Sequence, residues 1–248
     1  MSTPVSSIKQ IKRGEGALLS RVEYTRLAQT LLELTEEEWA APVPDCPGWT
    51  VKALASHVLG GLECVRKPKE FVRQYLAGIR LAKKLDLPGP VDGLNEVQIR
   101  KYAAMTGPQI AARIADLVEP ALRHRMRTPL VLRYGIWTKL DVKGRTPVAW
   151  VLDVVYTRDT FLHRLDVARA LGRDVEVDEV EGRVIADMVR EWAARHGQPV
   201  TLRLTGPAGG TYVAGTGGAE VECDAVEWAR AVAGRAPAVG LLATSVQI

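Results

Sequence analysis

Apolar side chains recur at helical spacing over most of the first two thirds of the chain. Between Leu18 and Leu34 the apolar residues Val22, Leu27 and Leu31 stand among Glu, Arg and Gln, so one side of a helix is apolar and the other polar. This spacing predicts an amphipathic helix that packs one face against a neighbouring element.

A second helix is predicted after the stretch 41–48, which is rich in Pro and Gly. Thr50 belongs to the residue types that cap helix N-termini, and the apolar positions that begin at Val51 follow the i, i+3, i+4, i+7 spacing. We expect this helix to continue, bent or interrupted at Pro68, as far as the breaker at 86–93. His57 lies near the edge of its apolar face.

Two further helical regions are predicted, one at 94–126 with a break at Gly107-Pro108, and one at Val148–Leu171. The residues between them, 128–147, are expected to form an irregular connection. Four helices with long connections describe a four-helix bundle.

The last part of the chain has a different pattern. Residues 177–196 predict one more helix, and three short β-type runs follow at 199–206, 210–215 and 219–223, separated by Gly-rich turns. Asp224, with Glu227 three residues later, is predicted to form the capping box of a final helix. We therefore predict two domains, a four-helix bundle at 1–174 and a small α+β domain at 175–248.

Composition narrows the classes of function. The net charge of +4 is spread along the 248-residue chain without a basic stripe, so nucleic-acid binding is not indicated. The three cysteines are far apart and form no C-x-x-C motif, which argues against a disulfide framework or a thiolate zinc site. We find no secretory leader and no apolar stretch long enough to span a membrane, so a cytoplasmic location without membrane association is expected.

The stretch RDTFLHRLD at 158–166 contains the first candidate for chemistry. Asp159 and His163 are four residues apart and therefore share one face of a helix, where a carboxylate and an imidazole can meet one divalent cation. His57 is the natural third ligand, because it lies at the edge of a face that must turn inward. Three protein ligands leave one coordination position open, as in catalytic sites.

Simpler interpretations compete with this one. Asp159 beside Arg158 also fits a solvated face with ion pairs, and a histidine at the edge of a core is often a packing residue. Asp166 can accept a hydrogen bond from His163 or pair with a neighbouring arginine, and Cys46 is expected to be buried in a turn. His124 and His196 are interpreted as a solvent-exposed residue and a cation at a helix C-terminus.

Two segments together resemble a known family. PGWTVKALASHVLG at 47–60 and TRDTFLHRLDVARALGR at 157–173 are similar to the Pro-Gly-Trp-Thr…His and Arg-Glu-x-x-x-His-x-x-Asp segments of the mycothiol-dependent maleylpyruvate isomerase family, a branch of the DinB-like four-helix-bundle metalloproteins. The tail at 201–235 is similar to that family's C-terminal domain, which is sterol-carrier-protein-like.

The resemblance implies a site and a reaction. It makes His57, Asp159 and His163 the ligands of a divalent metal, zinc or nickel, although the family usually has Glu where this chain has the shorter Asp159. It implies that mycothiol binds at the open metal position as a thiol cosubstrate. The reaction it implies is either transfer of this thiol to a small electrophile or isomerisation of that electrophile. Arg235 is the nearest equivalent of an arginine that binds the carboxylate of the substrate.

Two other functions remain open from the sequence. The metal can activate water instead of a thiol, which would make the protein a hydrolase but requires a general base that the sequence does not identify. Alternatively, the protein is a ligand-binding or regulatory relative without catalysis, for which the change to Asp159 is the best indication.

Overall fold

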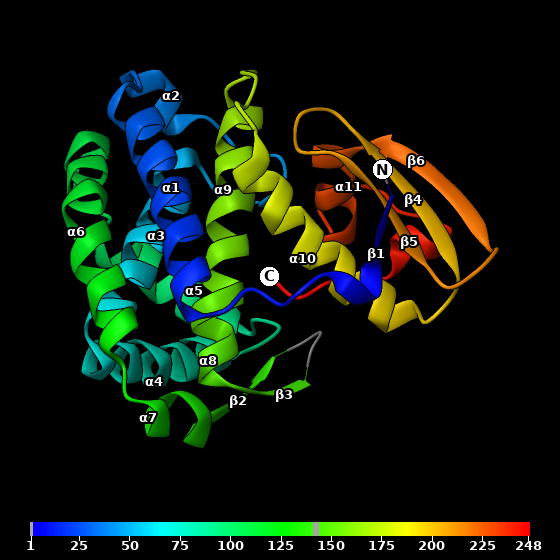
Figure 1. Ribbon diagram of the computed structural model, residues 1–248. Helices are drawn as coiled ribbons and strands as arrows, with labels where there is room; N and C mark the ends of the chain where they lie inside the picture. The colour runs from blue at the N-terminus through cyan, green and yellow to red at the C-terminus, as the bar shows by residue number, and fades with distance from the viewer. Residues whose placement is uncertain (1, 141–143) are drawn as a thin grey trace. The chain divides into compact units, whose positions relative to one another are not determined.

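The computed structural model describes residues 2–140 and 144–248 (Figure 1). These residues divide into two compact units, which are described separately. Unit 1 consists of Met1–Leu19, Pro129–Leu162 and Val175–Ile248, and unit 2 of Ser20–Thr128 and His163–Asp174. The predicted domain boundary between residues 174 and 175 stays a prediction.

Unit 2 is helical. It holds most of α1 and all of α2 to α6, together with the end of α9; the bounds are α1 Arg13–Leu32, α2 Glu36–Ala40, α3 Val51–Arg66, α4 Pro68–Leu85, α5 Pro90–Lys101, α6 Gly107–Arg127 and α9 Tyr156–Ala170. Helix α3 packs against α6, and α4 against α5. The core between them is built from fully buried leucines and isoleucines, among them Leu54, Leu59 and Ile114.

Local signals position these helices as expected. The hydroxyl of Thr50 accepts a hydrogen bond from the backbone N–H of Ala53, so it caps α3 as predicted. The predicted interruption falls at Lys67, which separates α3 from α4, and Pro68 occupies the first turn of α4. Helices α4 and α5 approach very closely where Gly78 faces Gly93. A Cβ on Gly93 would lie only 2.1 Å from the carbonyl oxygen of Gly78, so this approach requires glycine.

Unit 1 corrects one expectation. The stretch 128–147, predicted to be irregular, contains the helix α7 (Leu130–Gly135) and the antiparallel strands β2 (Trp137–Leu140) and β3 (Gly144–Pro147). Paired strands satisfy backbone groups that an irregular segment would leave to water, and this pairing is not visible in so short a polar sequence. A helical turn, α8 (Val148–Trp150), follows.

The helix predicted at Val148–Leu171 is not uniform. A π-helical turn at Val151–Val155 separates α8 from α9, and the backbone N–H of Tyr156 donates to the carbonyl of Val151, five residues earlier. The predicted long helix therefore exists, but it contains one turn that is wider than an α-helical turn.

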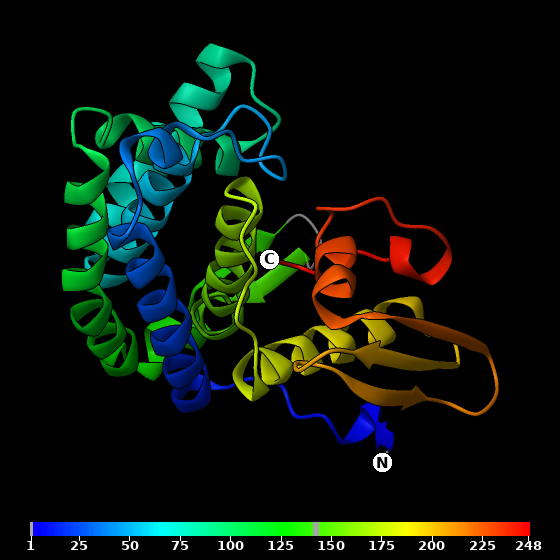
Figure 2. The ribbon, with the colours of Figure 1, turned by 90° about the horizontal axis from the view of Figure 1, so that it is seen from above.

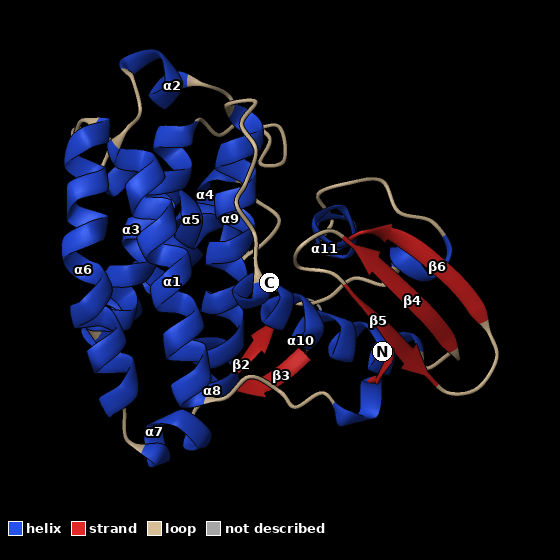
Figure 3. Cartoon of the chain, turned by 45° about the horizontal axis from the view of Figure 1, so that its top comes forward, coloured by secondary structure: helices blue, strands red, loops and turns tan. Residues whose placement is uncertain are grey.

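The rest of unit 1 is the predicted α+β region. Its elements are α10 Glu179–His196, β4 Val200–Thr205, β5 Gly210–Ala214, β6 Ala219–Asp224, α11 Ala225–Val232 and a 3-10 turn, η3, at Gly240–Ala243. Strand β4 pairs antiparallel with β5 and parallel with β6, and the three strands lie side by side (Figure 3). Helices α10 and α11 contact each other and the sheet (Figure 2).

The N-terminus completes this sheet. Strand β1 (Ser2–Pro4) pairs parallel with β5, which gives the order β1-β5-β4-β6, and a 3-10 turn, η1 (Val5–Ser7), follows it. Three exposed residues carry no periodic pattern, so the sequence did not predict this strand. Asp224 caps α11 as predicted, whereas Glu227 pairs with Arg230.

Arg158 organises the interior of unit 1. Its guanidinium is fully buried and pairs with Asp187 at 2.7 Å and Glu191 at 2.8 Å, and it also donates to the carbonyl of Gln247 at 2.9 Å. Burial raises the pKa of the Asp187 carboxyl, but the neighbouring Arg158 and Arg190 outweigh this effect and leave that pKa lowered. The sequence also allowed a solvated helical face at Arg158, and for this residue that interpretation is wrong.

Every helix in the described part of the chain is too short or too polar to cross a membrane.

We predict that Arg158→Ala lowers the free energy of unfolding by about 3–5 kcal/mol, because it leaves two buried carboxylates without their shared cation. Urea unfolding of the full chain, followed by circular dichroism, measures this loss. The control is Arg203→Ala, which removes an exposed pair with Glu220 and should cost less than about 1 kcal/mol. Equal losses in the two variants would contradict the prediction.

Candidate metal centre

The predicted ligands come from two helices. His57 lies in the middle of α3, and Asp159 and His163 lie one turn apart in α9. One ligand atom from each of the three residues lies within 4.8 Å of the other two. The rings of His57 and His163 meet edge to face, with their centroids 5.2 Å apart.

His57 is held by a side chain that the sequence analysis missed. Its Nδ1 lies 2.8 Å from Oε1 of Gln98, a buried residue of α5. Because an amide oxygen only accepts, Nδ1 carries the proton, and Nε2 is left with a lone pair for a metal. Gly60 makes this contact sterically feasible, since a Cβ there would lie 2.4 Å from Cγ of Gln98.

His163 is held in the same way. Its Nδ1 lies 2.9 Å from Oδ2 of Asp166, and both side chains are buried. The carboxylate accepts a hydrogen bond from Nδ1–H and so fixes the tautomer, which makes Nε2 the nitrogen of this ring that could hold a metal. Of the two roles that the sequence allowed for Asp166, the structure shows the hydrogen bond with His163, and the neighbouring Arg164 pairs with Glu23.

Trp49 forms a wall beside the two imidazoles. Its ring centroid lies 5.4 Å from that of His57 and 6.5 Å from that of His163. Trp49 directly precedes the cap Thr50, and its backbone carbonyl accepts a hydrogen bond from the N–H of Val43. Apart from the position of Trp49 in the PGWT segment, nothing in the sequence predicted that this ring lies at the site.

The donor set fits a divalent ion of borderline hardness. Two imidazole nitrogens and one carboxylate oxygen are ligands that zinc accepts, and each imidazole has the supporting hydrogen bond found in such sites. Ligand atoms on one tetrahedral zinc lie about 3.4 Å apart, so a separation of up to 4.8 Å closes by small side-chain rotations. Asp159 is half-buried.

A second group of potential ligands adjoins the first. Sγ of Cys46, a nitrogen of His163 and an oxygen of Asp166 also lie within 4.8 Å of one another. Cys46 is half-buried in a turn, as expected, and its thiol donates to Oδ2 of Asp166 over 3.6 Å. Its closeness to His163 was not predicted, because 117 residues separate the two in the chain.

The other candidates lie elsewhere. Arg235 is half-buried just after α11 in unit 1, and its proposed contact with a substrate stays a prediction. His196 ends α10, as expected, but it is not the predicted cation: its Nδ1 accepts a hydrogen bond from the backbone N–H of Gln198, and burial lowers its pKa. His124, expected to be exposed, is half-buried near the end of α6.

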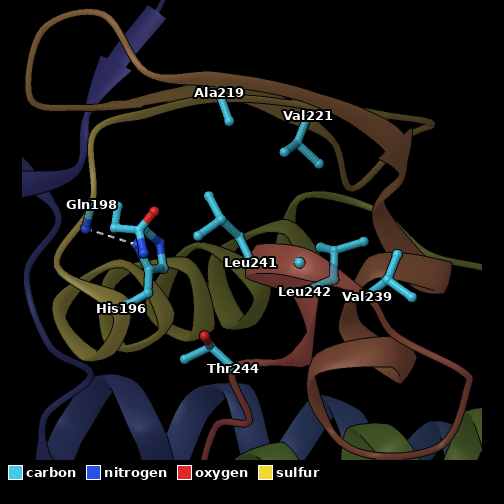
Figure 4. Close-up of a pocket in the computed structure, with 9 residues that line it drawn as sticks. His196, Gln198, Ala219, Val221, Val239, Leu241, Leu242 and Thr244 are labelled. Atoms are coloured by element: carbon cyan, nitrogen blue, oxygen red, sulfur yellow. Dashed lines mark hydrogen bonds between the residues drawn. The ribbon is translucent and has the colours of Figure 1, made fainter.

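Unit 1 contains a separate cavity of about 620 Å³ (Figure 4). It is lined mainly by aliphatic side chains, among them Val221 of β6 and Leu241 and Leu242 of η3, and also by His196. None of the three predicted metal ligands lines it.

We predict that Asp166→Asn weakens zinc binding about 10- to 100-fold, because the amide no longer holds the proton on Nδ1 of His163 as a carboxylate does. Competition with a zinc chelator measures the affinity. Asp174→Asn, which changes an exposed residue shortly after α9, is the control and should leave the affinity unchanged. An unaltered affinity in Asp166→Asn would show that this hydrogen bond does not support the ligand.

Comparison with known proteins identifies the family. Two solved structures match the fold with a TM-score of 0.56: the mycothiol-dependent maleylpyruvate isomerase, at 18% sequence identity, and a variant of it with one histidine replaced by alanine, at 17%. Each match covers 94% of this chain and 92% of the other. A search of curated proteins found no significant match. The family model named mycothiol maleylpyruvate isomerase N-terminal domain matches residues 20–168, more than half of the chain. The chain therefore belongs to this family of thiol-dependent isomerases, which confirms both the resemblance found in its motifs and the expectation that it is an enzyme.

Proposed function

We propose that the protein is a cytoplasmic, metal-dependent enzyme with mycothiol as its thiol cosubstrate. It either transfers mycothiol to a small electrophile or uses mycothiol to isomerise that electrophile. His57, Asp159 and His163 are the proposed ligands of one divalent metal. The observation that carries the proposal is the pair of facing imidazoles, each with its Nδ1 hydrogen-bonded and a carboxylate one helical turn away. Family membership supports the thiol-dependent chemistry.

The metal would activate the thiol as a nucleophile. A divalent ion in this site lowers the pKa of a thiol at its open position, so that the thiol is present as thiolate near neutral pH. Gln98 and Asp166 keep the protons of His57 and His163 on Nδ1, which puts the lone pair of each ring on Nε2. The chain thus prepares the ligands before the metal or the thiol arrives.

The surrounding residues would orient the electrophile. The ring of Trp49 offers an apolar surface beside the imidazoles, against which a planar conjugated substrate can stack. In an isomerisation, the thiolate adds to one carbon of an activated cis double bond, the electron pair moves onto the conjugated carbonyl, and rotation precedes loss of the thiolate. By resemblance alone, Arg235 is proposed to bind the carboxylate of the substrate.

We predict that His57→Ala and His163→Ala each reduce bound metal from about one ion per chain to less than about a tenth of that, because two ligands cannot hold the ion against competing chelators. Elemental analysis after reconstitution with zinc or nickel measures the content. His124→Ala removes a half-buried histidine from the same unit and should retain full metal content. Full metal content in either ligand variant would contradict the assignment.

The same variants test the reaction. Wild type should conjugate or isomerise a model electrophile with mycothiol and discriminate against glutathione, and both histidine variants should lose this activity. Turnover of an ester or amide without any thiol would favour the hydrolase. A wild-type protein that binds neither zinc nor nickel would support the non-catalytic relative and exclude both enzymatic functions.

We predict that Asp159→Glu binds zinc at least as tightly as wild type, because the added methylene extends the carboxylate toward the two imidazoles. Asp159→Asn, which keeps the size but removes the charge, should bind about 10- to 100-fold more weakly. Both affinities are measured by chelator competition. A large loss in Asp159→Glu would show that the backbone of α9 is placed for the shorter side chain.

A further inference from the structure

The loop before α3 holds a thiol against the face of α9 that carries His163. Residues 43–49 form a closed turn, in which the N–H of Val43 donates to the carbonyl of Trp49 and the N–H of Trp49 to that of Cys46. Asp45 pairs with Arg169 of α9 at 3.7 Å, so a second contact anchors the loop beside Cys46. All these residues belong to unit 2.

The spacing of the atoms around Asp166 fits a metal ion. Oδ2 of Asp166 lies 3.6 Å from Sγ of Cys46 and 2.9 Å from Nδ1 of His163. Sulfur and oxygen ligands on one tetrahedral zinc, with bonds of about 2.3 and 2.1 Å, lie about 3.6 Å apart. The distance between nitrogen and oxygen must open by about 0.5 Å to reach the roughly 3.4 Å that two such ligands adopt. Sγ of Cys46 lies within 4.8 Å of a nitrogen of His163.

We propose that Cys46, His163 and Asp166 form a second metal site, selective for thiophilic divalent cations such as cadmium or zinc. The thiol releases its proton to solvent when the ion binds, and the thiolate, one imidazole nitrogen and one carboxylate oxygen become the three protein ligands. A thiolate favours soft ions over magnesium or calcium.

The two sites compete for one imidazole. Binding at the proposed catalytic centre uses Nε2 of His163 with the proton on Nδ1, whereas the second site uses Nδ1, the nitrogen beside Asp166. A neutral imidazole carries one proton, so a ring that binds through Nδ1 carries it on Nε2. An ion at Cys46 therefore withdraws a ligand from the catalytic centre. This inhibitory consequence rests on the proposed function, but the binding does not.

The chain provides its own controls for a test. Cys64 is buried, donates to Oε1 of Gln74 and has its pKa raised to about 12 by that burial. Cys223 is half-buried like Cys46 but lies in β6 of unit 1. In a Cys223→Ser background, Cys46 is therefore the only cysteine that is not buried.

The experiment is a titration of the full chain with cadmium ion in the absence of other thiols, followed by the ultraviolet charge-transfer absorption of a cadmium–thiolate bond. The Cys223→Ser protein should show this absorption with one equivalent of cadmium. Adding Cys46→Ser or Cys46→Ala should weaken cadmium binding at least about tenfold and remove the absorption. Circular dichroism verifies that these variants are folded.

The decisive variant is Asp159→Ala in the same background. It removes a proposed catalytic ligand but leaves the second site intact, so cadmium affinity and absorption should change by less than about threefold. Loss of the absorption in Asp159→Ala, or its persistence in Cys46→Ser, would overturn the proposal. Neither result depends on whether zinc at His57 supports catalysis, so failure of the two proposals can be told apart.

Discussion

The periodicity of one helix is the constraint on which the site depends. Asp159, His163 and Asp166 follow the i, i+4, i+7 spacing of α9 and so share one face, while Arg158 is rotated about 100° from that face. Arg158 is fully buried among carboxylates of unit 1, and His163 and Asp166 are buried in unit 2. A buried guanidinium is costly unless it is paired, so the ion pairs with Asp187 and Glu191 hold the first turn of α9 against α10 within unit 1.

A common hydrogen-bond arrangement organises both imidazoles. In each, Nδ1–H donates a hydrogen bond to a side-chain oxygen. For His57 the acceptor is the amide oxygen of Gln98, and for His163 it is a carboxylate oxygen of Asp166. The two acceptors differ in charge, and the ionised one makes its imidazole the stronger electron donor. The two histidines are therefore not equivalent, and His163, with its negatively charged partner, is the better placed to stabilise positive charge. Its ring also lies next to Cys46, which is why this residue serves both proposals.

The sequence predicted what depends on local spacing. The cap at Thr50, the shared helical face of Asp159 and His163, and the strands β4 to β6 all follow from residue types within a few positions of one another. It did not reveal contacts between distant segments, such as Gln98 with His57 or Cys46 with Asp166, because nothing in either segment encodes its partner. Strand β1 and the burial of Arg158 depend on tertiary pairing in the same way. The position of His57 at the edge of an apolar helical face was enough to predict it as a third ligand, whereas the thiol chemistry came from the family resemblance alone.

The π-helical turn at Val151–Val155 has a consequence for how this protein can vary. Such a turn holds one residue more than an α-helical turn. Removing that residue would restore a regular helix but rotate everything before it by about 100° relative to α9. The aromatic and aliphatic residues of α8 would then face new neighbours, whereas Asp159 and His163 would keep their mutual spacing. A change of one residue in this turn therefore alters the packing around α8 without altering the spacing of Asp159 and His163.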